Sequence, residues 1–306
     1  MINQYAASVK SKRLWGRLKE SFFRCFFQLN GVFAVLILIG IFSLLFIEGF
    51  PALSKLGVSR FFFSDVWNPS SFEKEAYGLL AMLVSTLMVT LGALVIAVPV
   101  GIAAAAYIAD VASPRMREMV KPVIEILAGI PSVVVGFLGI IVVGPALARL
   151  FGASNGLNAV NGSLLLAVMA LPTIISISED AIMAVPQEFK SASLALGANR
   201  WQTLVRVTLP SALSGIVASV MLGMGRAIGE TMTVLMATGC APAMPGSFLD
   251  SVRTMTSTIA IELGETVQGG IHYRSLFVIA FVLFLMTFAV NLISDVILQK
   301  YQKVKR

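Results

Sequence analysis

Charged residues, cysteine and histidine are all scarce in this sequence, and each shortage argues against a class of protein. Only 13% of the 306 residues are charged, whereas soluble domains carry about a quarter, so a water-soluble enzyme is not expected. The two cysteines, Cys25 and Cys240, lie at opposite ends of predicted membrane spans, which argues against an intrachain disulfide. The single histidine, His272, has no second histidine with which to build a zinc site. We expect it to hydrogen-bond or face water in an outer loop, rather than to act as a ligand or a pH sensor.

Catalytic and nucleotide-binding patterns are also absent. The sequence has no HExxH, no GxSxG and no intramembrane Gly-Asp pair, so it lacks the catalytic patterns expected of an intramembrane hydrolase. No Gly-Lys dipeptide occurs, so the loop that would hold nucleotide phosphates is missing. No catalytic residue, metal site or cofactor is therefore predicted, and any uphill transport must draw its energy from a partner.

Long apolar segments are what the sequence has in excess. Of its residues 57% are hydrophobic, and six segments are each long enough, at about 20 residues, to cross the hydrocarbon core as a helix. They are continuously apolar rather than alternating, which excludes a β-barrel. We therefore predict an all-α, polytopic membrane protein with six transmembrane helices. The predicted spans are residues 26–46, 79–107, 122–147, 163–177, 211–238 and 275–298.

The distribution of basic residues predicts the orientation of these spans. Sixteen of the 23 Lys and Arg residues fall on the side that holds both termini and six on the other, which leaves Arg226 inside a span. Because basic residues are retained in the cytoplasm, both termini are predicted to be cytoplasmic. The predicted organisation is a basic tail (1–25), a first span (26–47), an extracytoplasmic loop (48–77), a five-helix core (78–298) that includes a cytoplasmic loop (186–210), and a second basic tail (299–306).

The cytoplasmic loop at 186–210 has the signals of two short helices. Glu188 suits a first helical turn, and Gly197 can end that helix in the left-handed conformation. Asn199 can then cap a second helix, with Gln202 three residues later. This second helix is expected to run to Pro210 with four residues on one face, namely Trp201, Leu204, Val205 and Thr208. Composition alone leaves open whether the loop is an interfacial connector or a partner-binding element.

The spacing within this loop resembles the E-A-A-x3-G-x9-I-x-L-P signature of ABC importer permeases. Gly197 lies six residues after Ser191, and Leu209-Pro210 complete the match, but the E-A-A part reads Ser191-Ala192-Ser193 and lacks the usual glutamate. In that family the loop inserts into a groove of an ATPase subunit, which binds the ATP. The resemblance implies the same coupling role here for Ser191, Ala192, Ser193, Gly197, Leu209 and Pro210.

Four further segments resemble the permease subunits of phosphate-specific ABC transporters. They are GMGRAIGETMTVLMATG (223–239), PTIISISEDA (172–181), EILAGIPSVVVGFLG (125–139) and IELGETVQGGIHYRSLF (261–277), while the VWNP and AYG stretches favour the PstC type over its PstA partner. The resemblance implies a type I ABC importer fold in a bacterial inner membrane, and a subunit that forms half of a phosphate pore. It also implies a sister permease of the PstA type, two ATPase subunits and an extracytoplasmic phosphate-binding protein. A permease for sulfate, molybdate or tungstate, an ATP-independent channel and a membrane enzyme are the alternatives.

Two charges within the fifth predicted span point independently to an anion pathway. Arg226 and Glu230 lie in an apolar helix, where an ionised side chain costs several kcal/mol unless it is paired or faces a cavity. Their spacing places both on one side of a continuous helix, so they could simply neutralise each other, although an arginine followed by a glutamate is the weaker order. We expect instead that Arg226 supplies donors to a passing oxyanion and that Glu230 holds or gates it.

Hydroxyl and small residues accompany these charges. Further predicted pathway residues are Thr231, Ser85, Thr86, Thr90 and Ser132. The alternative for these hydroxyls is a hydrogen bond to their own helix backbone. A stripe of small residues (Gly215, Ser219 and Gly223) and a G-x-x-x-G pair (Gly225 and Gly229) could pack within the chain or against a second subunit, which the sequence leaves open.

Overall fold

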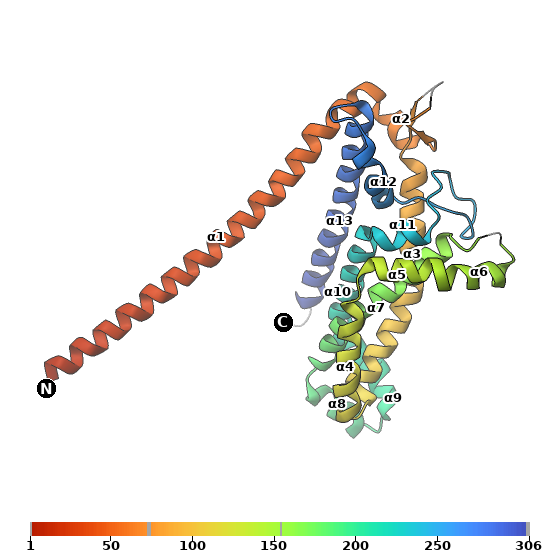
Figure 1. The fold of residues 1–306 in the computed structure, drawn as a ribbon. Helices are drawn as coiled ribbons and strands as arrows, with labels where there is room; N and C mark the ends of the chain where they lie inside the picture. The colour runs from red at the N-terminus through yellow and green to blue at the C-terminus, as the bar shows by residue number, and fades with distance from the viewer. Residues whose placement is uncertain (1, 72–74, 154, 304–306) are drawn as a thin grey trace.

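The computed structural model describes the backbone of residues 2–71, 75–153 and 155–303, and within those ranges the side chains of residues 20–297. Most of it is helical, with one short β-hairpin (Figure 1). The elements are α1 (Ile2–Leu56), α2 (Val58–Phe63), β1 (Trp67–Asn68), β2 (Ala76–Tyr77), α3 (Leu80–Ala106), η1 (Tyr107–Val111), α4 (Pro114–Ala128), α5 (Ser132–Leu138), η2 (Gly139–Val143), α6 (Gly144–Phe151), α7 (Ala159–Met183), α8 (Gln187–Ala195), α9 (Arg200–Thr203), η3 (Leu204–Thr208), α10 (Leu209–Gly229), α11 (Met232–Ala237), α12 (Met255–Glu262), η4 (Leu263–Glu265) and α13 (Ile271–Lys303).

Six helical segments of the described chain are long and apolar enough to cross a membrane. They are Glu20–Leu56, Leu80–Val111, Ser132–Phe151, Ala159–Met183, Arg200–Gly229 and Ile271–Ile297. The predicted all-α fold with six spans is therefore confirmed. The basic side chains expected near both ends, at 10–19 and 300–306, lie outside the described side chains.

The third predicted span, 122–147, is wrong at its start. Helix α4 ends at Ala128, and the chain turns through Gly129 to Pro131 before α5 begins at Ser132. Pro131 is the reason, because proline cannot donate a backbone hydrogen bond and disfavours helical backbone in the residue before it. The continuous segment α5, η2 and α6 then runs across the direction of α3 (Figure 1).

Helix α7 lies at the centre of the bundle. Its apolar segment is 61% buried, against at most 28% for the other spans, and it packs against α3 and α10. Small residues allow this close approach: at Gly101 of α3, an added Cβ would come within 2.7 Å of Ile174 on α7. The central position of α7 means that side chains on α3 and α10 are held relative to one common helix.

The N-terminal part of α1 extends away from the bundle, and its later part approaches α13 (Figure 1). There, Phe42 and Phe46 contact Phe281. Helix α1 runs without a break across the predicted boundaries at 25 and 47. The start of α1 and the end of α13 both point toward the end of the bundle that carries α8 and α9, while the β-hairpin and α12 lie at the other end. The predicted topology requires this arrangement of the termini and the loop.

Candidate functional site

The loop between α7 and α10 begins with a helix that stops where the sequence predicts. Helix α8 ends in a Schellman motif, in which the Ala198 amide donates to the Ser193 carbonyl (3.2 Å) and the Gly197 amide donates to the Leu194 carbonyl (3.0 Å). Gly197 has φ +89°, the left-handed conformation that favours glycine. The expected role of Gly197 as a helix stop is confirmed.

The second helix of the loop differs from the prediction in its length and its face. The predicted capping box of Asn199 and Gln202 is present at the start of α9. The helix does not end at Pro210, however, because α9 continues through the π-helical turn η3 into α10, and Pro210 lies in the first turn of α10. The four residues expected on one face divide into two buried (Leu204 and Thr208) and two exposed (Trp201 and Val205). The wider π turn changes the angular spacing of side chains, which is why that prediction was wrong.

The loop presents apolar side chains around an open groove of about 580 Å³. Leu196 is 90% exposed and Trp201 69%. Among the predicted coupling residues, Ala192, Ser193 and Gly197 line the groove, Ser191 is exposed on α8, and Leu209 and Pro210 lie in α10 outside the groove. An exposed apolar surface of this kind is typical of a protein–protein contact.

Arg226 lies in the last turn of α10, with its side chain exposed on the isolated chain. Its Nη1 lies 3.4 Å from Oγ1 of Thr173 on α7, a long hydrogen bond that leaves most of the guanidinium donors free. A cation in the last turn also interacts favourably with the negative end of the helix dipole. Thr173 was not among the predicted site residues, because nothing in the sequence indicates which residue of α7 faces α10.

The expected placement of Arg226 and Glu230 on one side of a continuous helix is wrong. Helix α10 ends at Gly229, and Glu230 adopts an extended backbone (ψ 132°) before α11 begins at Met232. Among the described ion pairs, Arg226 and Glu230 are not joined. Glu230 instead contributes its backbone carbonyl, which accepts a hydrogen bond from Thr256 of α12 (2.8 Å). The arginine is therefore not neutralised by this glutamate.

Among the described hydrogen bonds, Arg226 is joined to Thr173 and to none of the predicted hydroxyl residues. Ser85 and Thr86 are buried on α3 and each donates to the carbonyl four residues earlier (2.7 Å), which is the alternative that the sequence left open. Thr86 also accepts from the Met255 amide of α12 (3.0 Å). Of the other three, Thr90 is buried, while Ser132 and Thr231 are half-buried.

The stripe of small residues on α10 packs within the chain. An added Cβ at Gly223 would come within 2.8 Å of Ile174, and Ser219 is hydrogen-bonded to Ser178 of α7 (2.7 Å). By contrast, Gly229 has no atom within 4 Å of the position of an added Cβ. The stripe therefore serves the contact between α10 and α7, and the open end of α10 is the end near Arg226.

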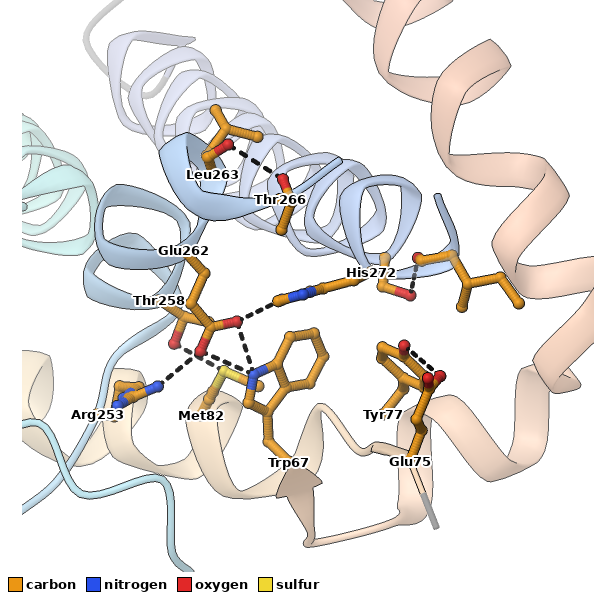
Figure 2. Close-up of polar contacts among 12 residues, drawn as sticks. Trp67, Glu75, Tyr77, Met82, Arg253, Thr258, Glu262, Leu263, Thr266 and His272 are labelled. Carbon is orange, nitrogen blue, oxygen red and sulfur yellow. Dashed lines mark hydrogen bonds and ion pairs between the residues drawn. The ribbon is translucent and has the colours of Figure 1, made fainter. Parts of the chain in front are cut away.

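A cluster of charged and aromatic residues joins the segments at the end of the bundle opposite α8 and α9, around Glu262 at the end of α12 (Figure 1 and Figure 2). Its carboxylate accepts hydrogen bonds from the Trp67 indole (3.0 and 3.1 Å) and forms ion pairs or hydrogen bonds with Arg253 (2.7 Å) and His272 (2.7 Å). Nearby, Tyr77 donates to Glu75 (2.7 Å), and burial, reinforced by this bond, raises the pKa of Tyr77 so that it remains a neutral donor. His272 thus forms a hydrogen bond, as expected, but it lies in the first turn of α13 and not in a loop. The rest of the cluster was not predicted, because Trp67 lies 195 positions from Glu262 and the other partners belong to different elements.

The α12 segment also holds both ends of α11. Arg253 Nε donates to the carbonyl of Cys240 after α11 (2.9 Å), and Thr256 bonds the carbonyl of Glu230 before α11. The extended break that follows Arg226 is therefore stabilised by residues that come more than twenty positions later in the chain.

Comparison with known proteins identifies the molecule. Residues 97–303 match the family described as the inner membrane component of binding-protein-dependent transport systems. The chain belongs to this family. The permease is 37% identical to a probable ABC transporter permease protein, YqgH, of Bacillus subtilis, over 79% of each chain. It is 34% identical to the phosphate transport system permease protein PstC of Xylella fastidiosa over 83% of each chain, and 30% identical to PstC of Pasteurella multocida over 96% of each.

Solved structures show the same fold at lower identity. The permease aligns with a chain of a bacterial ABC transporter that imports the acidic polysaccharide alginate, with a TM-score of 0.61, 16% identity, and coverage of 96% of this chain and 100% of that one. It aligns with a chain of the inward-facing MetNI methionine ABC transporter with a TM-score of 0.54, 19% identity, and coverage of 73% and 94%. The predicted type I ABC importer permease fold is thereby confirmed, and the family makes the chain a membrane component of a transport system.

The Glu262 cluster bridges the matched domain and the segment before it, since Trp67 precedes residue 97. We expect Glu262→Gln to destabilise the permease by about 3 kcal/mol, because it removes the counter-charge of Arg253, whose side chain is only 17% exposed. The measurement is the thermal unfolding midpoint of the purified permease in detergent, which should fall by several degrees. Glu265→Gln, at an exposed glutamate three residues later, is the control and should leave the midpoint unchanged. Equal midpoints for the two variants would contradict a stabilising role for the cluster.

Proposed function

We propose that this permease forms half of the membrane pore of an ATP-driven phosphate importer. The relatives named as phosphate transport system permease proteins support this substrate, since two of them align over 83% and 96% of the chain. The single observation that carries the proposal is the exposed, incompletely bonded Arg226 at the end of α10, because a guanidinium offers several donors to a phosphate oxyanion.

The exposed Arg226 also supports the presence of a second permease subunit. An exposed arginine on a membrane span is costly against hydrocarbon, so it requires a water-filled cavity or another chain to cover it. A sister permease, of the PstA type in a phosphate system, would cover the open face near Gly229 and Arg226 and enclose an aqueous path. In this arrangement Glu230 shapes the end of α10 through its backbone, and the buried Ser85, Thr86 and Thr90 support the packing of α3 rather than touch the substrate.

We assign energy supply to a separate pair of ATPase subunits, which bind the ATP, and substrate delivery to an extracytoplasmic phosphate-binding protein. The exposed groove beside Gly197 supports the first assignment, and the family description, which names a binding-protein-dependent system, supports the second. The permease itself needs no cofactor in this scheme. Both termini and the α8–α9 loop lie in the cytoplasm, and the chain lies in the bacterial inner membrane.

The proposal is tested by uptake of labelled phosphate into cells that lack other phosphate systems and express the permease with these partners. Uptake should require every partner and an active ATPase, and excess sulfate or molybdate should not compete. Competition by another oxyanion would assign the substrate to that anion instead. Uptake by the permease alone would identify an ATP-independent channel.

Docking of the ATPase is tested by crosslinking in a variant in which Cys25 and Cys240 are replaced by serine. A cysteine at Ser191 or Ala195, both exposed on α8, should crosslink to an ATPase subunit. A cysteine at Gln268, exposed at the opposite end of the bundle, is the control and should instead react with a membrane-impermeant reagent added outside intact cells. Labelling of position 191 from outside would contradict both the docking surface and the topology.

A further inference from the structure

Helix α8 has few anchors to the rest of the permease, since none of its residues is buried. Within the described part of the chain, an ion pair between Lys190 Nζ and Asp110 Oδ1 (2.6 Å) joins α8 to the end of the second span. The two side chains are only 13% and 19% exposed, so solvent screens this pair much less than a surface ion pair. A second contact, between Ser193 and Thr203 (2.9 Å), stays within the loop and joins α8 to α9.

Asp110 lies in the π-helical turn η1, and a second π-helical turn, η3, connects the loop to α10. Turn η1 closes the end of α3 with a hydrogen bond from the Ala112 amide to the Tyr107 carbonyl (2.8 Å). Turn η3 joins α9 to α10 in the same way, with the Leu209 amide bonded to the Leu204 carbonyl. Such turns are rare and occur frequently at functional sites. The loop is thus connected covalently to α7 and α10 and electrostatically to the end of α3.

Both α10 and α3 connect the loop to the surroundings of Arg226. Helix α10 carries the arginine in its last turn, and α3 packs along α7, which carries the Thr173 partner of that arginine. A displacement of α8 would reach α10 through the chain in any case. Between α8 and the α3–η1 segment, the described polar link is the Lys190–Asp110 ion pair, which adds to the packing of α3 against α7 and α10.

We propose that Lys190 and Asp110 are positioning residues that couple movement of the ATPase-facing helix α8 to α3, so that α3 and α10 move together during transport. The proposal rests on the proposed function of the α8–α9 loop as an ATPase contact. Without the ion pair, the ATPase still docks and still hydrolyses ATP, but the membrane helices respond incompletely, so less substrate moves for each ATP consumed.

The test uses the whole transporter, with its ATPase, sister permease and binding protein, reconstituted in vesicles that permit ATP hydrolysis and phosphate uptake to be measured together. Lys190→Gln and Asp110→Asn should each lower the phosphate imported per ATP by about fivefold or more, with hydrolysis and α8 crosslinking unchanged. The double variant should be no worse than either single variant, because both remove the same interaction. Lys190→Arg, which retains the charge, should restore most of the coupling.

The control is Asp180→Asn, which removes a carboxylate that pairs with Lys121 (3.5 Å) at the same end of the bundle but does not contact α8. An unchanged ratio in the single variants, or a parallel loss of hydrolysis and uptake, would overturn the proposal. Failure of the proposed function would look different: the wild-type transporter itself would show no ATP-driven phosphate uptake. If the wild type imports another oxyanion instead, the ratio measured with that anion still tests the ion pair.

Discussion

Replacement of Arg226 by glutamine is expected to reduce phosphate uptake by about 100-fold at normal membrane levels. Charged hydrogen bonds contribute about 1.5–3 kcal/mol each, and glutamine offers an oxyanion a neutral amide in place of the guanidinium. Arg226→Lys should retain part of the activity at best, because an ammonium lacks the planar arrangement of donors. The measurement is the initial rate of labelled phosphate uptake in cells without other phosphate systems, normalised to the amount of permease in the membrane.

The double variant Arg226→Gln with Glu230→Gln separates a pathway role from a structural one. A purely structural charge pair would recover when both charges are removed together, whereas a substrate-binding arginine would not. Since α10 ends between these residues and no ion pair joins them, we expect the double variant to be as inactive as Arg226→Gln. Arg149→Gln is the matched control, because Arg149 is also an exposed arginine in the last turn of a helix. Full uptake by the double variant would refute the pathway role.

Gly197→Val is expected to reduce the phosphate moved per ATP at least tenfold while leaving membrane insertion intact. Gly197 has φ +89°, and a residue with a β-carbon is strained there by about 1–2 kcal/mol. Because no atom lies within 4 Å of the position of an added Cβ, the expected effect is conformational and not a clash. The Schellman motif should open, and the groove lined by Ala192 and Ser193 should lose its shape.

Gly197→Asn provides the control for this substitution, because asparagine tolerates the left-handed conformation much better than valine does. It should retain most of the uptake at equal amounts of protein. The measurement is uptake together with ATP hydrolysis in the reconstituted transporter, where Gly197→Val should fall at least tenfold in the phosphate moved per ATP, or about 1.4 kcal/mol of coupling. Equal coupling in the valine and asparagine variants would show that the left-handed stop is dispensable.

The features that the sequence predicted correctly are those encoded by short stretches of chain. Continuous apolar segments account for six spans, because backbone groups in lipid must bond within their own helix. Gly197 and Asn199 mark the loop helices because a left-handed stop and a capping box each involve residues only a few positions apart. The arginine at 226 was also visible in the sequence, since a charge in an apolar segment stands out by itself.

Features that depend on distant residues came only from the tertiary structure. The break after Gly229 separates Arg226 from Glu230, and Thr256 of α12 helps to hold it open, so local helix spacing pointed to the wrong pairing. The Trp67–Glu262 and Lys190–Asp110 contacts join residues 195 and 80 positions apart, and neither position in a pair indicates its partner. The sequence alone therefore determined the number of spans, the signals that begin and end the loop helices, and the presence of a membrane arginine, because local hydrogen bonding and hydropathy control them. The tertiary packing of α3, α7, α10 and α12 decided which charges meet, because buried charges are stabilised by whichever partner the fold brings within reach.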